Sequence, residues 1–261
     1  MIQHSLFRLA AVAGAVFLAV SCSGKGNYNN DIEPGKPDKP SVTHKGPKAV
    51  FIGDSITWQW TQEREISKSK FDAAISLPDP LPSYMEDRGT SYWVSWHPAF
   101  FTQNGYANKG VSGERTDQML SRYQKDVLAL DPSVVVIMGG TNDLAQGYAK
   151  DHILANIKSM AEQAAAKNMQ VVLCSVTPCN MTYSKLSPRE KGTHIVALNG
   201  MIQDYAREKA FTYCDYYPAL VAQDGYSLKE EYCLYDRLHP NPDAYTLMEA
   251  VIKPIIDQLL K

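Results

Sequence analysis

The chain has 261 residues, of which 44% are hydrophobic and 21% charged, and its formal net charge is -2 at pH 7. This length suffices for one substantial hydrophobic core or two small ones, and the composition is typical of a globular protein. The charge balance provides no basic surface field, so we expect no nucleic-acid partner.

The first residues predict an exported protein. Arg8 precedes the apolar run LAAVAGAVFLAVS, which is short for a membrane span but typical of the core of a signal peptide. We therefore expect residues 1–21 to be a signal peptide. The run ends in LAVSC, which resembles a bacterial lipobox. This resemblance implies that Cys22 is lipidated and anchors the protein in the bacterial cell envelope, on its periplasmic or its surface face; ordinary signal cleavage beside an incidental cysteine is the alternative.

The segment after Cys22 has the composition of a tether. Residues 23–47 contain four prolines and four glycines but almost no large apolar side chains. Such a segment cannot bury enough apolar surface to fold. We expect residues 22–47 to connect the lipid anchor to a folded domain at residues 48–261.

Within that domain, short apolar runs alternate with segments of helical periodicity, which predicts a succession of strand–helix units. We expect strands at five places: 49–52, 106–111, 134–138, 170–176 and 211–216. The clearest helical segments are 114–130, 151–168, 192–210 and 241–260. Five strands alternating with helices predict a three-layer α/β/α sandwich around a parallel sheet.

Residues 58–105 are an aromatic-rich insertion in this alternation, because a simple strand–helix connection needs far fewer residues. The insertion contains all four tryptophans: Trp58, Trp60, Trp93 and Trp96. The proline-rich stretch SLPDPLPSY should form a loop. Trp93, Trp96 and Phe100 recur at spacings of three and four residues, which predicts one face of a helix, packed on the core rather than bound to substrate.

Small and polar residues gather where predicted strands end and where the last helix begins. The four segments are GDS at 53–55, NKGVSGERT at 108–116, GGTND at 139–143 and DRLHPN at 236–241. The carboxyl ends of parallel strands share one edge of a sheet, so we expect these segments to meet in one crevice. Taken singly, Asp54 and Ser55 could simply cap the helix that follows them, and Asn142 could cap the helix after the third predicted strand.

Together these residue types predict nucleophilic catalysis. Ser55 becomes a nucleophile when a histidine accepts its proton, and His239 with Asp236 three residues earlier provides the base and the carboxylate that orients it. The backbone amides of Ser55 and Gly113 and the side-chain amide of Asn142 would form an oxyanion hole. A glycine at position 113 would let the backbone approach the ligand closely.

In the order and character of these four segments the chain resembles the SGNH, or GDSL, hydrolase superfamily. GDSIT resembles the first block of that family, NKGVSGERT the second, GGTND the third and DRLHPN the last, over residues 48–261. The resemblance implies a flavodoxin-like sheet, ester hydrolysis through an acyl-enzyme, and no metal or organic cofactor. Within the superfamily the chain looks closest to the platelet-activating-factor acetylhydrolase-like and carbohydrate acetylesterase groups.

The leading hypothesis is a serine esterase that removes short acyl groups, acetyl above all, from a carbohydrate or another extracellular ester. A lysophospholipase or thioesterase, and a catalytically silent glycan-binding lipoprotein, are the alternatives. Trp58 follows Ser55 by one helical turn, so we expect it to bind the part of the substrate remote from the ester. The sequence indicates no oligomeric state.

Besides Cys22 the chain has four cysteines, none with metal-ligand spacing. Cys174 and Cys214 lie in predicted strands, which favours small buried hydrophobic residues. Cys179 and Cys233 lie in predicted loops on the catalytic side of the sheet. A disulfide between them would fix the loop that carries the acid and the base, and two thiols are the alternative.

Overall fold

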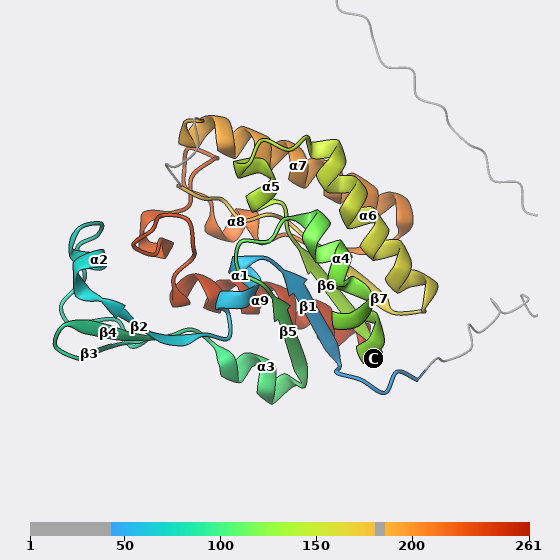
Figure 1. The fold of residues 1–261 in the computed structure, drawn as a ribbon, viewed down its shortest axis with the longest axis horizontal. Helices are drawn as coiled ribbons and strands as arrows, with labels where there is room; N and C mark the ends of the chain where they lie inside the picture. Colours follow the sequence, from blue (N-terminus) through green and yellow to red (C-terminus); the bar gives the residue numbers. More distant parts are fainter. Residues whose placement is uncertain (1–42, 181–185) are drawn as a thin grey trace, which may run out of the picture. The chain divides into compact units, whose positions relative to one another are not determined.

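A computed structural model describes residues 43–180 and 186–261 of the chain. The expected signal peptide, Cys22 and nearly all of the expected tether lie outside these residues. Five strands form the central sheet in the order β5-β1-β6-β7-β8, and every neighbouring pair is parallel (Figure 1). Their bounds are β1 Ala49–Gly53, β5 Tyr106–Gly110, β6 Val134–Met138, β7 Gln170–Cys174 and β8 Thr212–Cys214. In chain order this is the 2-1-3-4-5 arrangement of flavodoxin-like folds, so the expected sheet is confirmed.

Helices cover both faces of the sheet, as expected for a three-layer sandwich (Figure 1). One face packs on α4, α6 and α7, and the other on α3, α8 and α9. The bounds are α3 Pro98–Asn104, α4 Thr116–Asp126, α6 Lys150–Ala166, α7 Pro188–Lys209, α8 Tyr217–Leu220 and α9 Pro242–Leu259. The four helices expected from periodicity are all present, with ends displaced by a few residues. The short α1 (Ser55–Gln59) and α5 (Thr141–Ala145) follow β1 and β6 directly.

Strand β1 shows how the sequence specifies the middle layer. All five of its residues are buried, and alternate side chains enter different cores. Ala49 and Phe51 pack with the residues of α9, whereas Val50 and Ile52 pack with those of α4 and α6. A strand covered on both faces has no polar side to show, which explains its continuous apolar sequence.

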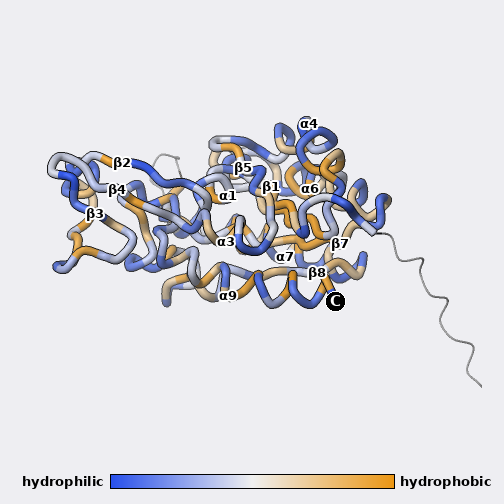
Figure 2. The backbone as a smooth tube through the Cα atoms, turned by 90° about the horizontal axis from the view of Figure 1, so that it is seen from below, coloured by the Kyte–Doolittle hydropathy of each residue, from blue (hydrophilic) through white to orange (hydrophobic). Residues whose placement is uncertain are grey.

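The insertion forms a second, smaller sheet that sequence periodicity did not predict. Its strands β2 (Glu63–Ser67), β3 (Met85–Asp87) and β4 (Ser91–Ser95) pair antiparallel in the order β2-β4-β3, and α2 (Lys68–Asp72) follows β2. Figure 2 shows the largely hydrophilic course of β2 at the left, in contrast to the hydrophobic segments around β7 at the right. The proline-rich stretch at 76–84 contains no helix or strand, as expected.

The predicted helix face of Trp93, Trp96 and Phe100 is wrong. Trp93 lies in β4, Trp96 in the loop after it, and Phe100 in α3. The two residues beside Trp93 in β4 are buried and Trp93 itself is half-buried, which is the period-two pattern of a strand. Trp96 and Phe100 do pack in the core, whereas Trp93 does not.

Residues 44–46 already contact the folded domain, at Asp131 in the loop before β6. The Nδ1 atom of His44 lies 2.7 Å from Oδ1 of Asp131, and the backbone N–H of Lys45 donates to the same carboxylate. The N–H of Gly46 donates to the carbonyl of Asp131. The last residues of the expected tether therefore belong to the folded domain. Among the helices in the described ranges, none is long and apolar enough to cross a membrane.

Candidate active site

The four polar segments meet at the carboxyl edge of the central sheet. Ser55 begins α1 directly after β1, and Asn142 lies in α5 directly after β6. The loop that carries Gly113 follows β5, and the N–H of Val111 in this loop donates to the carbonyl of Gly53 at the end of β1. The sequence-based expectation that these segments converge is confirmed.

Ser55, His239 and Asp236 form one hydrogen-bonded chain. Nε2 of His239 lies 2.8 Å from Oγ of Ser55, and Nδ1 of His239 lies 2.7 Å from Oδ2 of Asp236. The other carboxylate oxygen, Oδ1, accepts the backbone N–H groups of His239 at 2.9 Å and Leu238 at 3.0 Å. This geometry can pass the proton of Ser55 to the imidazole while the carboxylate fixes the ring.

The electrostatic state of Asp236 suits this position. Burial opposes its ionisation, but the side-chain hydrogen bond and the charge of His239, with the backbone N–H groups of His239 and Leu238, outweigh that effect. The pKa of Asp236 consequently lies below its usual value. The group is therefore a carboxylate at neutral pH and can accept a hydrogen bond from Nδ1–H of His239.

The structure brings Asn142 and the loop of Gly113 together. The side-chain Nδ2 of Asn142 donates to the carbonyl of Glu114 at 2.8 Å, which uses one of its two N–H groups. The N-cap of α5 is Gly140, so the structure does not support the alternative that Asn142 caps this helix. Gly113 is exposed with a φ of 83°, a left-handed conformation that favours glycine.

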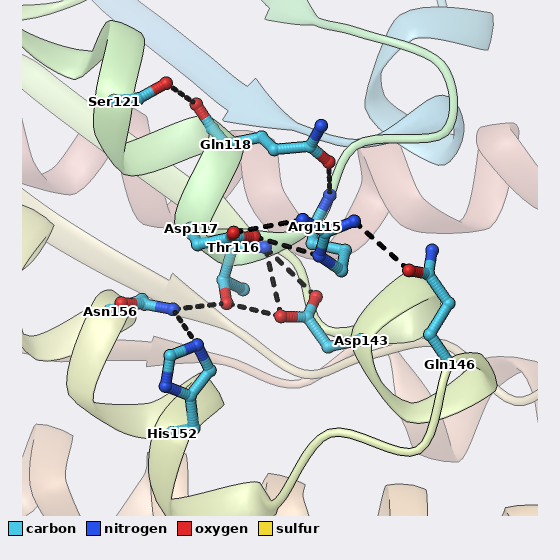
Figure 3. A network of polar contacts seen from close by, with 9 residues as sticks. All are labelled: Arg115, Thr116, Asp117, Gln118, Ser121, Asp143, Gln146, His152 and Asn156. Carbon is cyan, nitrogen blue, oxygen red and sulfur yellow. Dashed lines mark hydrogen bonds and ion pairs between the residues drawn. The ribbon is translucent and has the colours of Figure 1, made fainter.

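A buried hydrogen-bond network, which the sequence did not indicate, fixes the loop of Gly113 (Figure 3). The carboxylate of Asp143, which is 0% exposed, accepts the hydroxyl of Thr116 at 2.6 Å and the backbone N–H of Thr116 at 3.0 Å. The side chain of Asn156 on α6 donates to the same hydroxyl at 3.0 Å. Asp143 follows Asn142, and Thr116 lies three residues after Gly113. The carboxylate of Asp143 therefore fixes the segment of Asn142 and the loop of Gly113 relative to each other. The one sequence signal for this structural role of Asp143 is its position in the polar segment GGTND at 139–143.

A second set of contacts joins the same loop to β1, the strand that precedes Ser55. Nε of Arg122 lies 2.7 Å from the carboxylate of Glu114, and Nη2 of Arg122 donates to the carbonyl of Gly53 at 3.3 Å. Both side chains of this ion pair are largely buried, so solvent screens the pair less than an exposed one. The carbonyl that accepts the hydrogen bond lies two residues before Ser55.

The disulfide that we considered between Cys179 and Cys233 does not form in the structure. Asn180 instead provides a noncovalent connection between the two loops. Its backbone N–H donates to the carbonyl of Arg237 at 2.8 Å, and its side chain exchanges hydrogen bonds with the backbone of Leu228. Its Nδ2 also donates to Sγ of Cys233 at 3.2 Å. The loop of Asp236 and His239 is thus held without a covalent bridge.

The two tryptophans after Ser55 have different environments. Trp60 is 1% exposed and its Nε1 donates to the carboxylate of Glu249, so it belongs to the core. Trp58 is half-buried, and the guanidinium of Arg64 lies over its ring. Of the two, only Trp58 is available for a ligand. Among residues 43–180 and 186–261, no group of His, Cys, Asp or Glu side chains converges in the way a metal ion requires.

Asp54, the residue before Ser55, is a buried acid with a structural role. It caps α1 by accepting the N–H of Ile56 at 2.9 Å. Burial raises the pKa of Asp54 to about 6. The hydrogen bond from Ile56 and the charge of His239 lower this pKa, but by less than burial raises it. Between about pH 4 and pH 6 the folded protein therefore keeps a proton that the unfolded chain releases, and stability declines as the pH rises through this window.

Asp54→Asn should remove the decline in stability between about pH 4 and pH 6, because asparagine does not titrate and remains a good helix cap. The free energy of unfolding of the variant, relative to wild type, should rise by about 2 kcal/mol between about pH 4 and pH 7. Urea unfolding at several pH values measures the difference, with Asp151→Asn on the exposed start of α6 as the control. A difference that stays constant with pH would mean that Asp54 titrates as in the unfolded chain.

The similarity of the chain to known proteins shows which class of protein it belongs to. Residues 51–247 match the model of the GDSL-like Lipase/Acylhydrolase family. The chain belongs to this family, and the resemblance inferred from its four segments is confirmed. Family and site together place it among hydrolases that act on acyl esters.

Individual relatives agree with this class. An acetylxylan esterase from Geobacillus stearothermophilus is 31% identical over 107 residues, which cover 40% of this chain and only 42% of that protein. The solved structure of a GDSL-like lipase from Bacteroides thetaiotaomicron is 31% identical, with a TM-score of 0.64, and covers 80% of this chain and 87% of that one. A catalytic mutant of an acetylxylan esterase from Geobacillus stearothermophilus gives a TM-score of 0.55 at 18% identity, over 82% of this chain and 95% of that one, a likeness of fold alone.

Proposed function

We propose that the protein is a serine esterase that hydrolyses short-chain acyl esters, acetyl above all, on a carbohydrate or another extracellular substrate. The observation that carries the proposal is the hydrogen-bonded chain from Ser55 through His239 to Asp236. A hydroxyl in contact with an imidazole, which is in turn oriented by a carboxylate, is the arrangement that activates a serine nucleophile.

In the proposed mechanism, Oγ of Ser55 attacks the ester carbonyl while Nε2 of His239 accepts its proton. The tetrahedral oxyanion accepts hydrogen bonds from the backbone N–H groups of Ser55 and Gly113 and from the second side-chain N–H of Asn142. Collapse of this intermediate releases the alcohol, which takes the proton from His239, and leaves the acyl group on Ser55. A water molecule then attacks the acyl-enzyme with His239 as base, and the carboxylic acid is released.

The acyl chain length and the alcohol are supported by weaker observations. The acetylxylan esterase relative favours an acetyl group on a sugar. Trp58 lies one helical turn beyond Ser55 and is half-buried, which suits an aromatic surface for the part of the substrate remote from the ester.

Turnover of p-nitrophenyl acetate and p-nitrophenyl palmitate tests the proposal directly. The acetate should be hydrolysed faster by wild type, and neither ester should be hydrolysed by Ser55→Ala. Faster turnover of the palmitate would indicate a lysophospholipase or thioesterase on longer acyl chains. No turnover of either ester would favour a binding protein.

We also propose that Cys22 anchors the protein by a lipid to the bacterial cell envelope. The support is the sequence LAVSC at the end of the apolar run, followed by a segment with the composition of a tether. Globomycin, which blocks cleavage of lipoprotein precursors, should leave the precursor unprocessed in a bacterial host. Cys22→Ala should abolish membrane association in the same host, and normal processing under globomycin would contradict the anchor.

A further inference from the structure

Arg64 on β2 is a cation held in place but left without a carboxylate. Its guanidinium carbon lies 5.4 Å from the ring centroid of Trp58 and 5.1 Å from that of Trp96. A guanidinium has five N–H donors. Among residues 43–180 and 186–261 the guanidinium of Arg64 makes one hydrogen bond, from Nη2 to the neutral Oε1 of Gln59 at 3.2 Å. Its Nε is buried without a partner. Within the described chain Arg64 forms no ion pair.

A second arginine of the same small sheet shows the contrast. The guanidinium of Arg88 lies 4.5 Å from the ring centroid of Trp93, so it stacks on a tryptophan as Arg64 does. Arg88, however, is within 3.5 Å of the carboxylate of Glu65 and 3.2 Å of that of Glu86. The insertion therefore supplies two carboxylates to one stacked arginine and none to the other. A partly buried charge without a partner is unfavourable, so Arg64 is suited to a carboxylate that arrives with a ligand.

The position of Arg64 relative to the nucleophile supports this. Trp58 follows Ser55 by three residues on α1, and residues at this spacing are neighbours on one helix face. The side chain of Gln59 and the indole N–H of Trp96 both donate to the carbonyl of Pro240, at 3.3 and 3.5 Å. Pro240 directly follows His239. Trp58 is the helical neighbour of Ser55, and the guanidinium of Arg64 lies over the ring of Trp58. These two steps separate the guanidinium from Ser55 by on the order of 10 Å.

We infer that Arg64 binds a carboxylate of the substrate, and hence that the substrate class of the esterase is an acylated acidic sugar, such as a uronic acid. The inference rests on the proposed esterase function. The planar fork of a guanidinium matches the two oxygens of a carboxylate, and stacking on two indoles orders the side chain before the ligand arrives. A lysophospholipid phosphate would offer similar anionic oxygens. Of the two tryptophan rings beside Arg64, Trp96 is buried and Trp58 is partly exposed. The ring of Trp58 favours the sugar, whose apolar ring face packs on an aromatic surface.

Two matched acetates test the inference. Triacetylated methyl β-xyloside and triacetylated methyl β-glucuronoside carry the same acetylated hydroxyls, and only the second has a carboxylate on its ring. Acetate release by wild type should give a kcat/KM for the glucuronoside that exceeds that for the xyloside by on the order of tenfold, as expected for hydrogen bonds to a charged group. Arg64→Gln should lower this ratio to about one, and Arg64→Lys should give an intermediate ratio because it keeps the charge but loses the fork.

Arg88→Gln is the matched control, because it removes a stacked arginine of the same sheet and should keep the wild-type ratio. A wild-type ratio of the two kcat/KM values near one would overturn the inference, and so would an unchanged ratio in Arg64→Gln. Turnover of p-nitrophenyl acetate would in either case still support the esterase function. Faster turnover of lysophosphatidylcholine than of either glycoside would contradict an acylated sugar as the substrate.

Binding separates the inference from catalysis. NMR titration of Ser55→Ala with the two acetylated glycosides should show tighter binding of the glucuronoside, and adding Arg64→Gln should remove the difference. If wild type hydrolyses no ester, the proposed function fails and this titration alone decides the inference. Equal binding of the two glycosides to Ser55→Ala would then contradict it.

Discussion

Ser55→Ala should reduce kcat for p-nitrophenyl acetate by at least about 10³-fold while the protein stays folded. Nε2 of His239 lies 2.8 Å from the hydroxyl, so the substitution removes the one atom that the imidazole can activate. Ser55 follows β1 at the start of α1, and its hydroxyl belongs to neither of the two cores on either side of that strand. The free energy of unfolding should therefore change by less than about 1 kcal/mol.

Initial rates and thermal unfolding, measured on the same preparation, check this result. Ser121→Ala is a suitable control, because Ser121 is exposed on α4 and donates only to the carbonyl of Gln118. The control should match wild type in both measurements. Residual activity of Ser55→Ala above a few per cent would remove Ser55 from the nucleophile role, and a large drop in Tm would show that the loss came from the fold.

Asn142→Ala should reduce kcat by on the order of 10²-fold or more with a much smaller change in KM. An oxyanion donor interacts with charge that develops only in the transition state, so its loss should appear in kcat. The contact of Asn142 with the carbonyl of Glu114 would also be lost, but Asp143 and Thr116 still hold that loop through buried hydrogen bonds. The loop should therefore keep its place in the variant.

Gln146→Ala provides the control for Asn142, because it removes an amide at the other end of α5 that contacts Arg115. This variant should keep a near wild-type kcat. A near-neutral effect of Asn142→Ala would mean that its amide serves only to tie α5 to the loop. An increase in KM alone would assign Asn142 to substrate binding in the ground state.

The sequence was sufficient for the central sheet and for the residues that meet at its edge. Strands such as β1 and β6 are buried on both faces, so their apolar runs are unambiguous, and polar residues after parallel strands must share an edge. The order of the segments around Ser55, Gly113, Asn142 and His239 then indicated the candidate site.

The rest depended on contacts between distant residues. Strand β2 has the sequence EREIS, with one buried apolar residue, so periodicity could not reveal it. The role of Asp143 arises from its hydrogen bonds to Thr116, 27 residues earlier. The spacing of Trp93, Trp96 and Phe100 fits a helix by coincidence, because a strand, a loop and a helix each contribute one residue.

The double burial of β1 has a consequence for how the enzyme loses activity under stress. Any opening of this strand must break both hydrophobic cores at once, so its amide hydrogens should exchange with solvent only through global unfolding. Ser55 closely follows the end of this doubly buried strand, whereas His239 lies in a turn held by Asn180 and Asp236 through hydrogen bonds without a disulfide. In moderate denaturant His239 should therefore leave its position before Ser55 does, and inactivation should precede the loss of the sheet.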